Sequence, residues 1–263
     1  MILPHVTNEP TEGILARLQA EQLQLRERVI TTDCVPFSFS ATNPAHIEGL
    51  QLVGGVDISF LDEGFETAVA GLVVLAYPSF QVVHKELRPC RFTLPYIAGY
   101  LAFREAPVLN EMIQDLRRNH PEHVPQVIFV DGNGLLHPRG FGLASHLGVL
   151  ADIPTIGVAK NFLAVDDGPS LTVNGVNTAF REQLARGIDR MPLVGESGRV
   201  WGMAVSATKT IRPIYVSVGH CVSLDTAVNL VARCCQFRIP EPIRVADQVT
   251  RQYIREHSHP PQK

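Results

Sequence analysis

The sequence predicts an α/β fold in which a mixed sheet is flanked by helices, and three observations lead to this prediction. Three strand-like runs follow one another between residues 50 and 89 with only short turns between them, which favours antiparallel neighbours. Strand-like and helix-like segments then alternate, as they do where parallel strands are joined by right-handed crossovers. The run at 127–130 is apolar at every position, which is typical of a strand that is covered on both faces.

The individual helices and strands are assigned from periodicity and from turn residues. A first helix is predicted at 12–28, where leucine and isoleucine recur among Glu, Gln and Arg. The elements predicted after it, in chain order, are strands at 50–60, 67–77 and 80–89, a helix at 100–119, a strand at 126–131, a helix at 140–150 and a strand at 155–159. Three antiparallel strands followed by helix, strand, helix and strand is the order found in ribonuclease H-like folds.

The last hundred residues are predicted to begin with a turn-rich surface segment at 166–197, which includes a short helix at 178–186. Strand character returns at 200–206 and 213–218, and helices are predicted at 223–237 and 243–256. No low-complexity linker divides the chain. We therefore expect a single domain over 1–263, with a helical extension at 1–48 and a disordered tail at 257–263.

Composition limits the class of protein. The chain has 263 residues, of which 45% are hydrophobic and 19% charged, enough apolar material for a full core. It has no apolar run of the ~18 residues that a membrane span needs, and residues 1–10 do not resemble a secretory signal. We expect a monomer without a membrane partner, located in the cytoplasm, with nuclear or nucleolar locations also compatible.

Cysteine usage and net charge narrow the choice of ligands. The five cysteines are odd in number and form no CxxC pair, which argues against a disulfide framework and against a zinc site. The net charge of −3 gives no global attraction to nucleic acid. Any phosphate binding is therefore expected from a local basic patch, or from metal ions that offset carboxylates.

Two charged residues stand at the ends of the predicted parallel strands. Asp131 ends the strand at 126–131 and precedes a Gly-Asn-Gly turn, and Lys160 follows the strand at 155–159. Ligands of open α/β sheets bind outside the carboxyl ends of the strands. We expect Asp131 and Lys160 to face one crevice.

Two further carboxylates fall at unusual positions. Asp57 alternates with Val56 and Ile58 on a strand expected at the centre of the sheet, although a solvated polar face would explain it as well. Glu105 lies on the apolar stripe that Leu101 and Leu109 define on the helix at 100–119. A carboxylate on a core-facing stripe must be paired, protonated or bound to metal; salt bridges with Arg104 or Lys85 are the structural alternative.

Asp57, Glu105 and Asp131 together suggest a metal-dependent hydrolase. Carboxylate oxygens are the ligands that Mg²⁺ prefers, and Mn²⁺ is expected to substitute. A pair of such ions activates water and stabilises the leaving oxygen in phosphodiester hydrolysis. Placement of the acids on this fold order therefore predicts an endonuclease with a two-metal mechanism.

Six stretches in this order resemble the endonuclease V family, whose members are inosine-directed nucleases. Similarity at 237–242 to the animal members extends the resemblance over most of the chain. The stretches are Val-Gly-Gly-Val-Asp-Ile-Ser-Phe at 53–60, Pro-Tyr-Ile-Ala-Gly-Tyr-Leu-Ala-Phe-Arg-Glu at 95–105, Val-Asp-Gly-Asn-Gly at 130–134, His-Pro-Arg-Gly-Phe-Gly-Leu-Ala-Ser-His-Leu-Gly at 137–148, Gly-Val-Ala-Lys at 157–160 and Ser-Val-Gly-His at 217–220.

The resemblance implies roles for individual residues. Asp57, Glu105 and Asp131 would bind metal, and Lys160 would lie beside the scissile phosphate. His220 resembles the active-site histidine of the family and His137 a second one, either for acid–base work or for phosphate contact, although His137 before Pro138 would also suit a turn. The whole set of catalytic residues implied is Asp57, Glu105, Asp131, Lys160, His220 and His137.

The resemblance also implies a pocket that reads an extruded base. Tyr96 after Pro95 matches the aromatic wedge of the family, although an ordinary buried tyrosine is the plain alternative, and Ala98 stands where bacterial relatives commonly have proline. Arg139 is a candidate for phosphate contact. The residues implied for the pocket, whose glycines allow close approach of the backbone, are Gly99, Leu101, Gly134 and Gly142.

The implied reaction is cleavage of the second phosphodiester 3′ to inosine, leaving 3′-hydroxyl and 5′-phosphate ends. Asn133 and the Ser-Val-Gly-His form resemble the animal members, which favours single-stranded inosine-containing RNA over deoxyinosine in DNA. Three alternatives remain at this point: a DNA repair endonuclease, an inosine- or RNA-binding module without activity, and a sugar kinase or nucleotide-binding enzyme that uses the Asp-Gly-Asn-Gly turn for phosphate.

Overall fold

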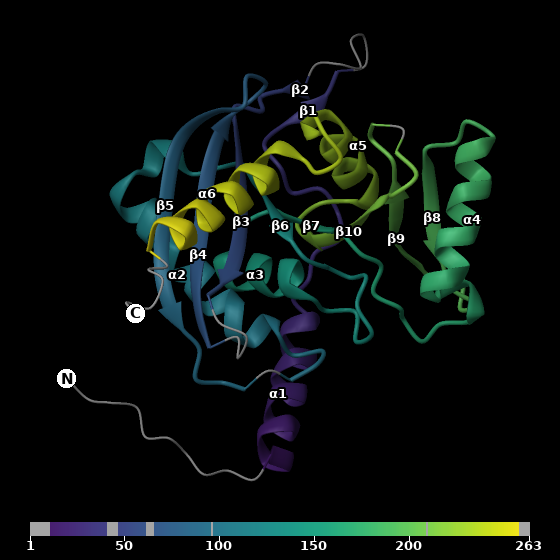
Figure 1. Ribbon diagram of the computed structural model, residues 1–263, viewed down its shortest axis with the longest axis horizontal. Helices are drawn as coiled ribbons and strands as arrows, with labels where there is room; N and C mark the ends of the chain where they lie inside the picture. Colours follow the sequence, from purple (N-terminus) through teal and green to yellow (C-terminus); the bar gives the residue numbers. More distant parts are fainter. Residues whose placement is uncertain (1–10, 41–46, 62–65, 96, 209, 258–263) are drawn as a thin grey trace, which may run out of the picture.

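A single mixed sheet of eight strands organises the protein, with helices on both of its faces (Figure 1). The computed structural model describes residues 11–40, 47–61, 66–95, 97–208 and 210–257. The strand order is β5-β4-β3-β6-β7-β10-β9-β8. This arrangement confirms the predicted ribonuclease H-like mixed sheet.

The first half of the sheet is built as predicted. Strands β3 (Leu52–Phe60), β4 (Thr67–Ala76) and β5 (Gln81–Arg91) pair antiparallel in chain order. Strands β6 (Val127–Asp131) and β7 (Thr155–Ala159) then add in parallel beside β3. The carboxyl ends of β3, β6 and β7 therefore meet at the same end of the sheet.

Helices cover the two faces of this half with separate apolar clusters. On one face, α2 (Ala102–Asn119) and α3 (Leu143–Ala151) pack against β3, β4 and β6, and Met112 and Leu147 are fully buried there. On the other face, α6 (Glu241–His257) packs against β3 and β4, and α5 (Leu224–Cys234) packs against the strands of the second half of the sheet. Helix α5 begins after Ser223, whose hydroxyl accepts a hydrogen bond from the backbone N–H of Thr226 at 3.1 Å. Figure 1 shows α6 crossing the strands obliquely.

The second half of the sheet differs from the prediction in one strand. Strands β9 (Val200–Val205) and β10 (Ile214–His220) were expected, but β8 (Arg190–Val194) lies within the segment predicted to be irregular. The predicted short helix is longer, at α4 (Val173–Ala185), and follows a 3₁₀ turn, η2 (Pro169–Leu171). Phe180 of α4 and Leu193 of β8 are buried in a separate small apolar core.

Short elements complete the fold. Helix α1 (Thr11–Arg26) contacts α3, and a two-stranded sheet of β1 (Ser38–Phe39) and β2 (Ile47–Glu48) was not predicted. A 3₁₀ turn, η1 (Pro121–His123), follows α2. Helix α6 continues to His257, and the rest of the predicted tail lies outside the described residues. Strands β5 and β8 are the outer strands of the sheet, and their Pro89 and Pro192 are exposed.

Within the described part of the chain, we find no helix whose length and apolar character would suit a membrane crossing.

Candidate active site

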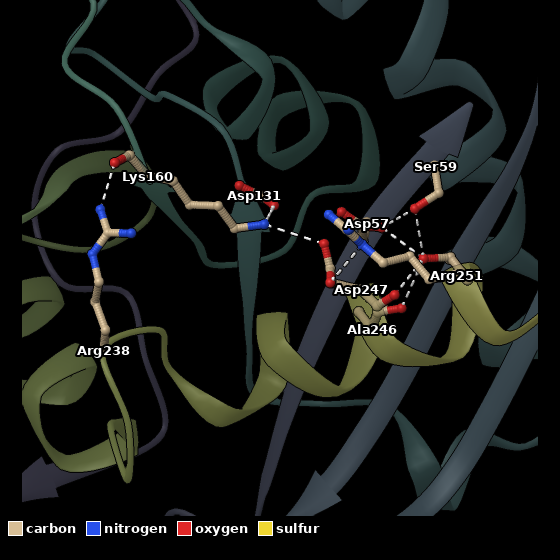
Figure 2. Close-up of polar contacts among 9 residues, drawn as sticks. Asp57, Ser59, Asp131, Lys160, Arg238, Ala246, Asp247 and Arg251 are labelled. Carbon is tan, nitrogen blue, oxygen red and sulfur yellow. Dashed lines mark hydrogen bonds and ion pairs between the residues drawn. The ribbon is translucent and has the colours of Figure 1, made fainter. Parts of the chain in front are cut away.

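Three carboxylates meet at the carboxyl ends of the central strands. One oxygen from each of Asp57, Asp131 and Asp247 lies within 4.8 Å of the others. Figure 2 shows these side chains pointing toward one another from β3, from β6 and from helix α6. Two members of this group were predicted, and the third was not.

Strand pairing explains why Asp57 and Asp131 are neighbours. Val56 on β3 is the parallel partner of Val130 on β6, so the next residue on each strand is an aspartate at the same level. Helix α6 brings Asp247 because it lies directly on β3. A Cβ atom on Gly55 would be 2.0 Å from the carbonyl oxygen of Pro242, so the helix can sit at this depth only over a glycine.

Hydrogen bonds hold Asp57 in place. Its Oδ2 accepts from the hydroxyl of Thr250 on α6 at 2.8 Å and from the hydroxyl of Ser59 at 3.0 Å. Burial raises the pKa of Asp57 to about 6; the Thr250 hydrogen bond lowers it, while the charges of Asp131 and Asp247 raise it further. The three carboxylates thus repel one another, and a bound cation would stabilise their ionised forms.

Lys160 supplies positive charge at this point. Its Nζ lies 2.6 Å from Oδ2 of Asp131 and 3.2 Å from Oδ1 of Asp247. Burial by itself would lower the pKa of Lys160, but the hydrogen bond and charge of Asp131, with the charge of Asp247, raise it overall. Arg238 fixes the backbone here by donating to the carbonyl of Lys160 at 2.7 Å. Asp131 and Lys160, which were predicted to face one crevice, therefore form a direct ion pair.

Glu105 lies nearby but outside the tight group. It occupies the first turn of α2 and is 6% exposed. Burial raises its pKa to about 8, the charge of Asp57 raises it and that of Arg104 lowers it, and Asp131 adds a further increase. The charges of both aspartates thus act on Glu105. Its carboxylate is not among the three whose oxygen atoms lie within 4.8 Å of one another.

A cavity of about 460 Å³ adjoins the acidic group. Asp131 and Glu105 line it together with Gly99 and Gly142. Gly99 has φ +82°, and a Cβ atom there would lie 2.4 Å from Nη1 of Arg139. The predicted residues that line this cavity are Gly99, Leu101, Glu105, Asp131, His137, Arg139 and Gly142.

The family model for endonuclease V matches residues 38–248, a range that contains every one of these residues. The chain belongs to the endonuclease V family. Curated endonuclease V proteins of Homo sapiens and Mus musculus are each 47% identical to this chain over 247 residues, which is 94% of this chain and 85% and 71% of those proteins. Membership makes the protein an endonuclease.

Solved structures of the family superpose closely. Human ENDOV is 47% identical with a TM-score of 0.83, covering 93% of this chain and 100% of that one. Endonuclease V of Ciona intestinalis, solved in complex with a DNA containing an inosine followed by a ribo-adenosine, is 34% identical with a TM-score of 0.85, covering 94% and 99%.

Gly134, predicted for the base pocket, and Pro95, predicted beside the wedge, do not line this cavity. A Cβ atom on Gly134 would be 1.9 Å from the carbonyl oxygen of Val218, and its N–H donates to the Ser217 hydroxyl at 2.9 Å. Gly134 thus packs the turn against β10 behind the cavity. Pro95 is exposed before the cavity loop, and the predicted wedge Tyr96 lies outside the described residues.

The two predicted histidines occupy different places. His137 lines the cavity, and its Nδ1 accepts a hydrogen bond from the backbone N–H of Arg139 at 3.2 Å, while burial lowers its pKa to about 4. His220 is paired with Thr155 at the start of β7, whereas Lys160 follows the end of that strand. Five residues of strand separate them by about 15 Å, so the structure does not bring His220 to the acidic group.

Sequence reasoning missed Asp247, Thr250 and Gln22. Asp247 and Thr250 lie within the helix predicted at 243–256, and the signal available was their spacing beside the buried Ala246. Gln22 on α1 is 2% exposed and donates to the carbonyls of Gly99 at 3.2 Å and Phe141 at 3.1 Å. The N-terminal helix therefore ties two loops of the cavity together.

Proposed function

We propose that this chain is a metal-dependent endonuclease that cuts single-stranded RNA at the second phosphodiester 3′ to inosine, leaving 3′-hydroxyl and 5′-phosphate ends. The observation that carries the proposal is the position of the acidic group. Asp131 belongs both to the three-carboxylate group and to the wall of the adjoining cavity. A base bound in the cavity would therefore place its strand against the carboxylates.

Residues at this centre fit a hard divalent cation. Asp57, Asp131 and Asp247 offer only oxygen ligands, and the Lys160 ammonium already bridges two of them as a cation would. We infer that these three residues hold Mg²⁺ or Mn²⁺, with Glu105 close enough to share a second ion. Such ions supply an activated water and offset charge on the leaving oxygen.

Lys160 is proposed to contact the scissile phosphate. Its ammonium pairs with both Asp131 and Asp247 and offsets part of their charge. When a cation takes over that charge, the lysine is free to turn toward a phosphate oxygen a short distance away. Lys160 also lines a groove with Arg181 and Arg212, which gives a strand leaving the acidic group a positively charged path.

The cavity suits a purine read by shape. Gly99 and Gly142 bring backbone close to any ligand, and Cβ atoms at either position would clash with neighbouring atoms. Asn133 lines the cavity, and its Oδ1 is buried without a hydrogen-bond partner among the described residues. Hypoxanthine lacks the exocyclic amine of guanine, so a close-fitting wall rejects guanine by leaving no room for that amine.

A ribose beside the inosine is the reason for choosing RNA. The Ciona intestinalis relative was solved with an inosine followed by a ribo-adenosine. The second phosphodiester 3′ to inosine begins at the 3′ oxygen of that next nucleotide, so its 2′-hydroxyl would lie beside the cleaved bond. A contact to this hydroxyl distinguishes RNA from DNA at a given site.

The test uses four matched 5′-labelled single strands: RNA with one inosine, the same RNA with guanosine, DNA with one deoxyinosine, and that DNA with a single ribose after the deoxyinosine. With Mg²⁺, we expect the inosine RNA and the strand with one ribose to be cleaved. Both should be cleaved faster than the all-DNA strand. EDTA should abolish it. Equal rates on all-DNA would favour the DNA repair alternative, and binding without cleavage would favour an inactive inosine-binding module.

A further inference from the structure

Three histidine side chains gather on the far side of the molecule from the acidic group. His84 comes from β5, His120 follows α2, and His123 ends η1. Their ring centroids are 5.3 Å apart for His84 and His120, 5.8 Å for His84 and His123, and 5.9 Å for His120 and His123. Three imidazoles from separate elements thus occupy one small volume.

A carboxylate completes this group. Oε1 of Glu122 lies 3.7 Å from Nδ1 of His120 and 3.8 Å from Nδ1 of His123. Ligand atoms of these three residues all lie within 4.8 Å of one another. His120 and Glu122 are exposed, so their side chains have room to adjust toward a shared ion.

Two nitrogen atoms of the group are buried without a partner. Nε2 of His84 and Nδ1 of His123 have almost no exposed surface, and neither has a hydrogen-bond partner among the described residues. A buried nitrogen that makes no hydrogen bond destabilises the folded state unless a ligand engages it. Burial, followed by the charges of His120 and His123, lowers the pKa of His84, which favours the neutral imidazole that a metal ligand must be.

The group is separate from the acidic centre. Glu105 lies in the first turn of α2 and His120 just beyond its last residue, so the helix separates them by about 22 Å. On β5, His84 is paired with Val74, at the level of Gly54 near the start of β3 and away from Asp57. An ion held here would not touch a substrate bound at the aspartates.

We propose that His84, His120, Glu122 and His123 form a second metal site, which binds a divalent transition ion of the Zn²⁺ class. Imidazole nitrogen with one carboxylate is a donor set that Zn²⁺ accepts and Mg²⁺ does not favour. The ion would join the outer strand β5 to the turn after α2. Its expected effect is on stability, because an ion that binds only the folded state shifts the unfolding equilibrium.

The test measures Zn²⁺ binding to the metal-free, untagged full chain by calorimetry, with Mg²⁺ in excess to occupy the aspartates. We expect one equivalent of Zn²⁺, at least tenfold weaker binding in His120→Ala, and loss of the transition in the variant with His84, His120 and His123 all changed to Ala. Co²⁺ should give a visible absorption spectrum in the wild type that the triple variant lacks.

Two controls make the result interpretable. His257→Ala removes an exposed histidine that stacks on Tyr253 and should leave Zn²⁺ affinity unchanged. Each of the histidine variants should keep its Mg²⁺-dependent cleavage, which shows that it is folded. Equal Zn²⁺ affinity in the wild type and the triple variant would overturn the proposal, as would loss of the Zn²⁺ transition in Asp57→Asn with the histidines intact. Neither outcome bears on the nuclease function.

Discussion

Asp247 completes the acidic group from a part of the chain far from the other two aspartates. It shares the Lys160 ammonium with Asp131 and also pairs with Nε of Arg251 at 2.9 Å. Without Asp247, Asp57 and Asp131 beside one lysine would carry a net charge of about −1. The third acid adds a further negative charge and a further oxygen ligand for a cation.

We expect Asp247→Asn to lower Mg²⁺-dependent cleavage by about 100-fold or more, because the amide keeps the shape but removes a ligand and a charge. Cleavage rates at saturating substrate, measured over a range of Mg²⁺ concentrations, test this. Asp225→Asn, at an exposed position on α5, is the matched control and should leave the rate unchanged. A wild-type rate in Asp247→Asn would remove this residue from the proposed site.

At the scale of elements, α1 acts on the cavity through Gln22. In Gln22→Leu, two buried carbonyls, of Gly99 and Phe141, lose a donor, at a cost of about 1–3 kcal/mol. We expect weaker binding of the inosine strand with a smaller change in the maximal rate, because the metal ligands are untouched. Steady-state kinetics separate the two effects, and the exposed Gln19→Leu on the same helix serves as control. A loss confined to the maximal rate would contradict this role.

The contact between α6 and β3 gives a second prediction at this scale. Gly55→Ala would place a Cβ atom 2.0 Å from the Pro242 carbonyl oxygen and force the helix away from the strand. We expect about 2–3 kcal/mol of destabilisation and a loss of Mg²⁺ affinity, since Asp247 moves with the helix. Denaturant unfolding and metal titration measure the two. Gly13→Ala, which meets no atom within 4 Å, should be neutral or stabilising; an unchanged Gly55→Ala variant would contradict the argument.

Elements differ in how far the sequence could predict them. The strands that carry Asp57 and Asp131 have strong apolar patterns, and both their order and their pairing are confirmed. Strand β8 was missed because it is short and interrupted by Pro192. The part played by Asp247 depends on where α6 crosses the sheet, and helical periodicity alone does not contain that information. His220 was misplaced because a motif match does not say at which end of a strand a residue lies.

For the whole molecule, the buried acids make the free energy of unfolding depend on pH. The pKa of Asp57 is raised from 3.8 to about 6 and that of Glu105 from 4.5 to about 8, in each case chiefly by burial. The folded state therefore binds these protons more tightly than the unfolded state. The stability they contribute is present below about pH 4 and is lost as the pH rises through about 6 and then about 8; for Asp57 it is roughly 3 kcal/mol.

We therefore expect metal-free protein to lose thermal stability through these two groups between about pH 5 and pH 8. Mg²⁺ should restore more stability at the higher pH, because protons compete with the ion for the same oxygens. Thermal melts with EDTA or Mg²⁺ across this range provide the measurement. Glu105→Gln should flatten the upper part of the pH dependence relative to wild type; an identical slope in the variant would show that Glu105 does not titrate there.

The exposed prolines on the two outer strands bear on behaviour in crowded solutions. An outer strand offers a row of amide and carbonyl groups to which a strand of another molecule can add. Pro89 near the end of β5 and Pro192 at the middle of β8 have no N–H to donate, so each interrupts that row. Both borders of the sheet therefore discourage strand-by-strand polymerisation, and concentrated samples should stay free of fibrous aggregates.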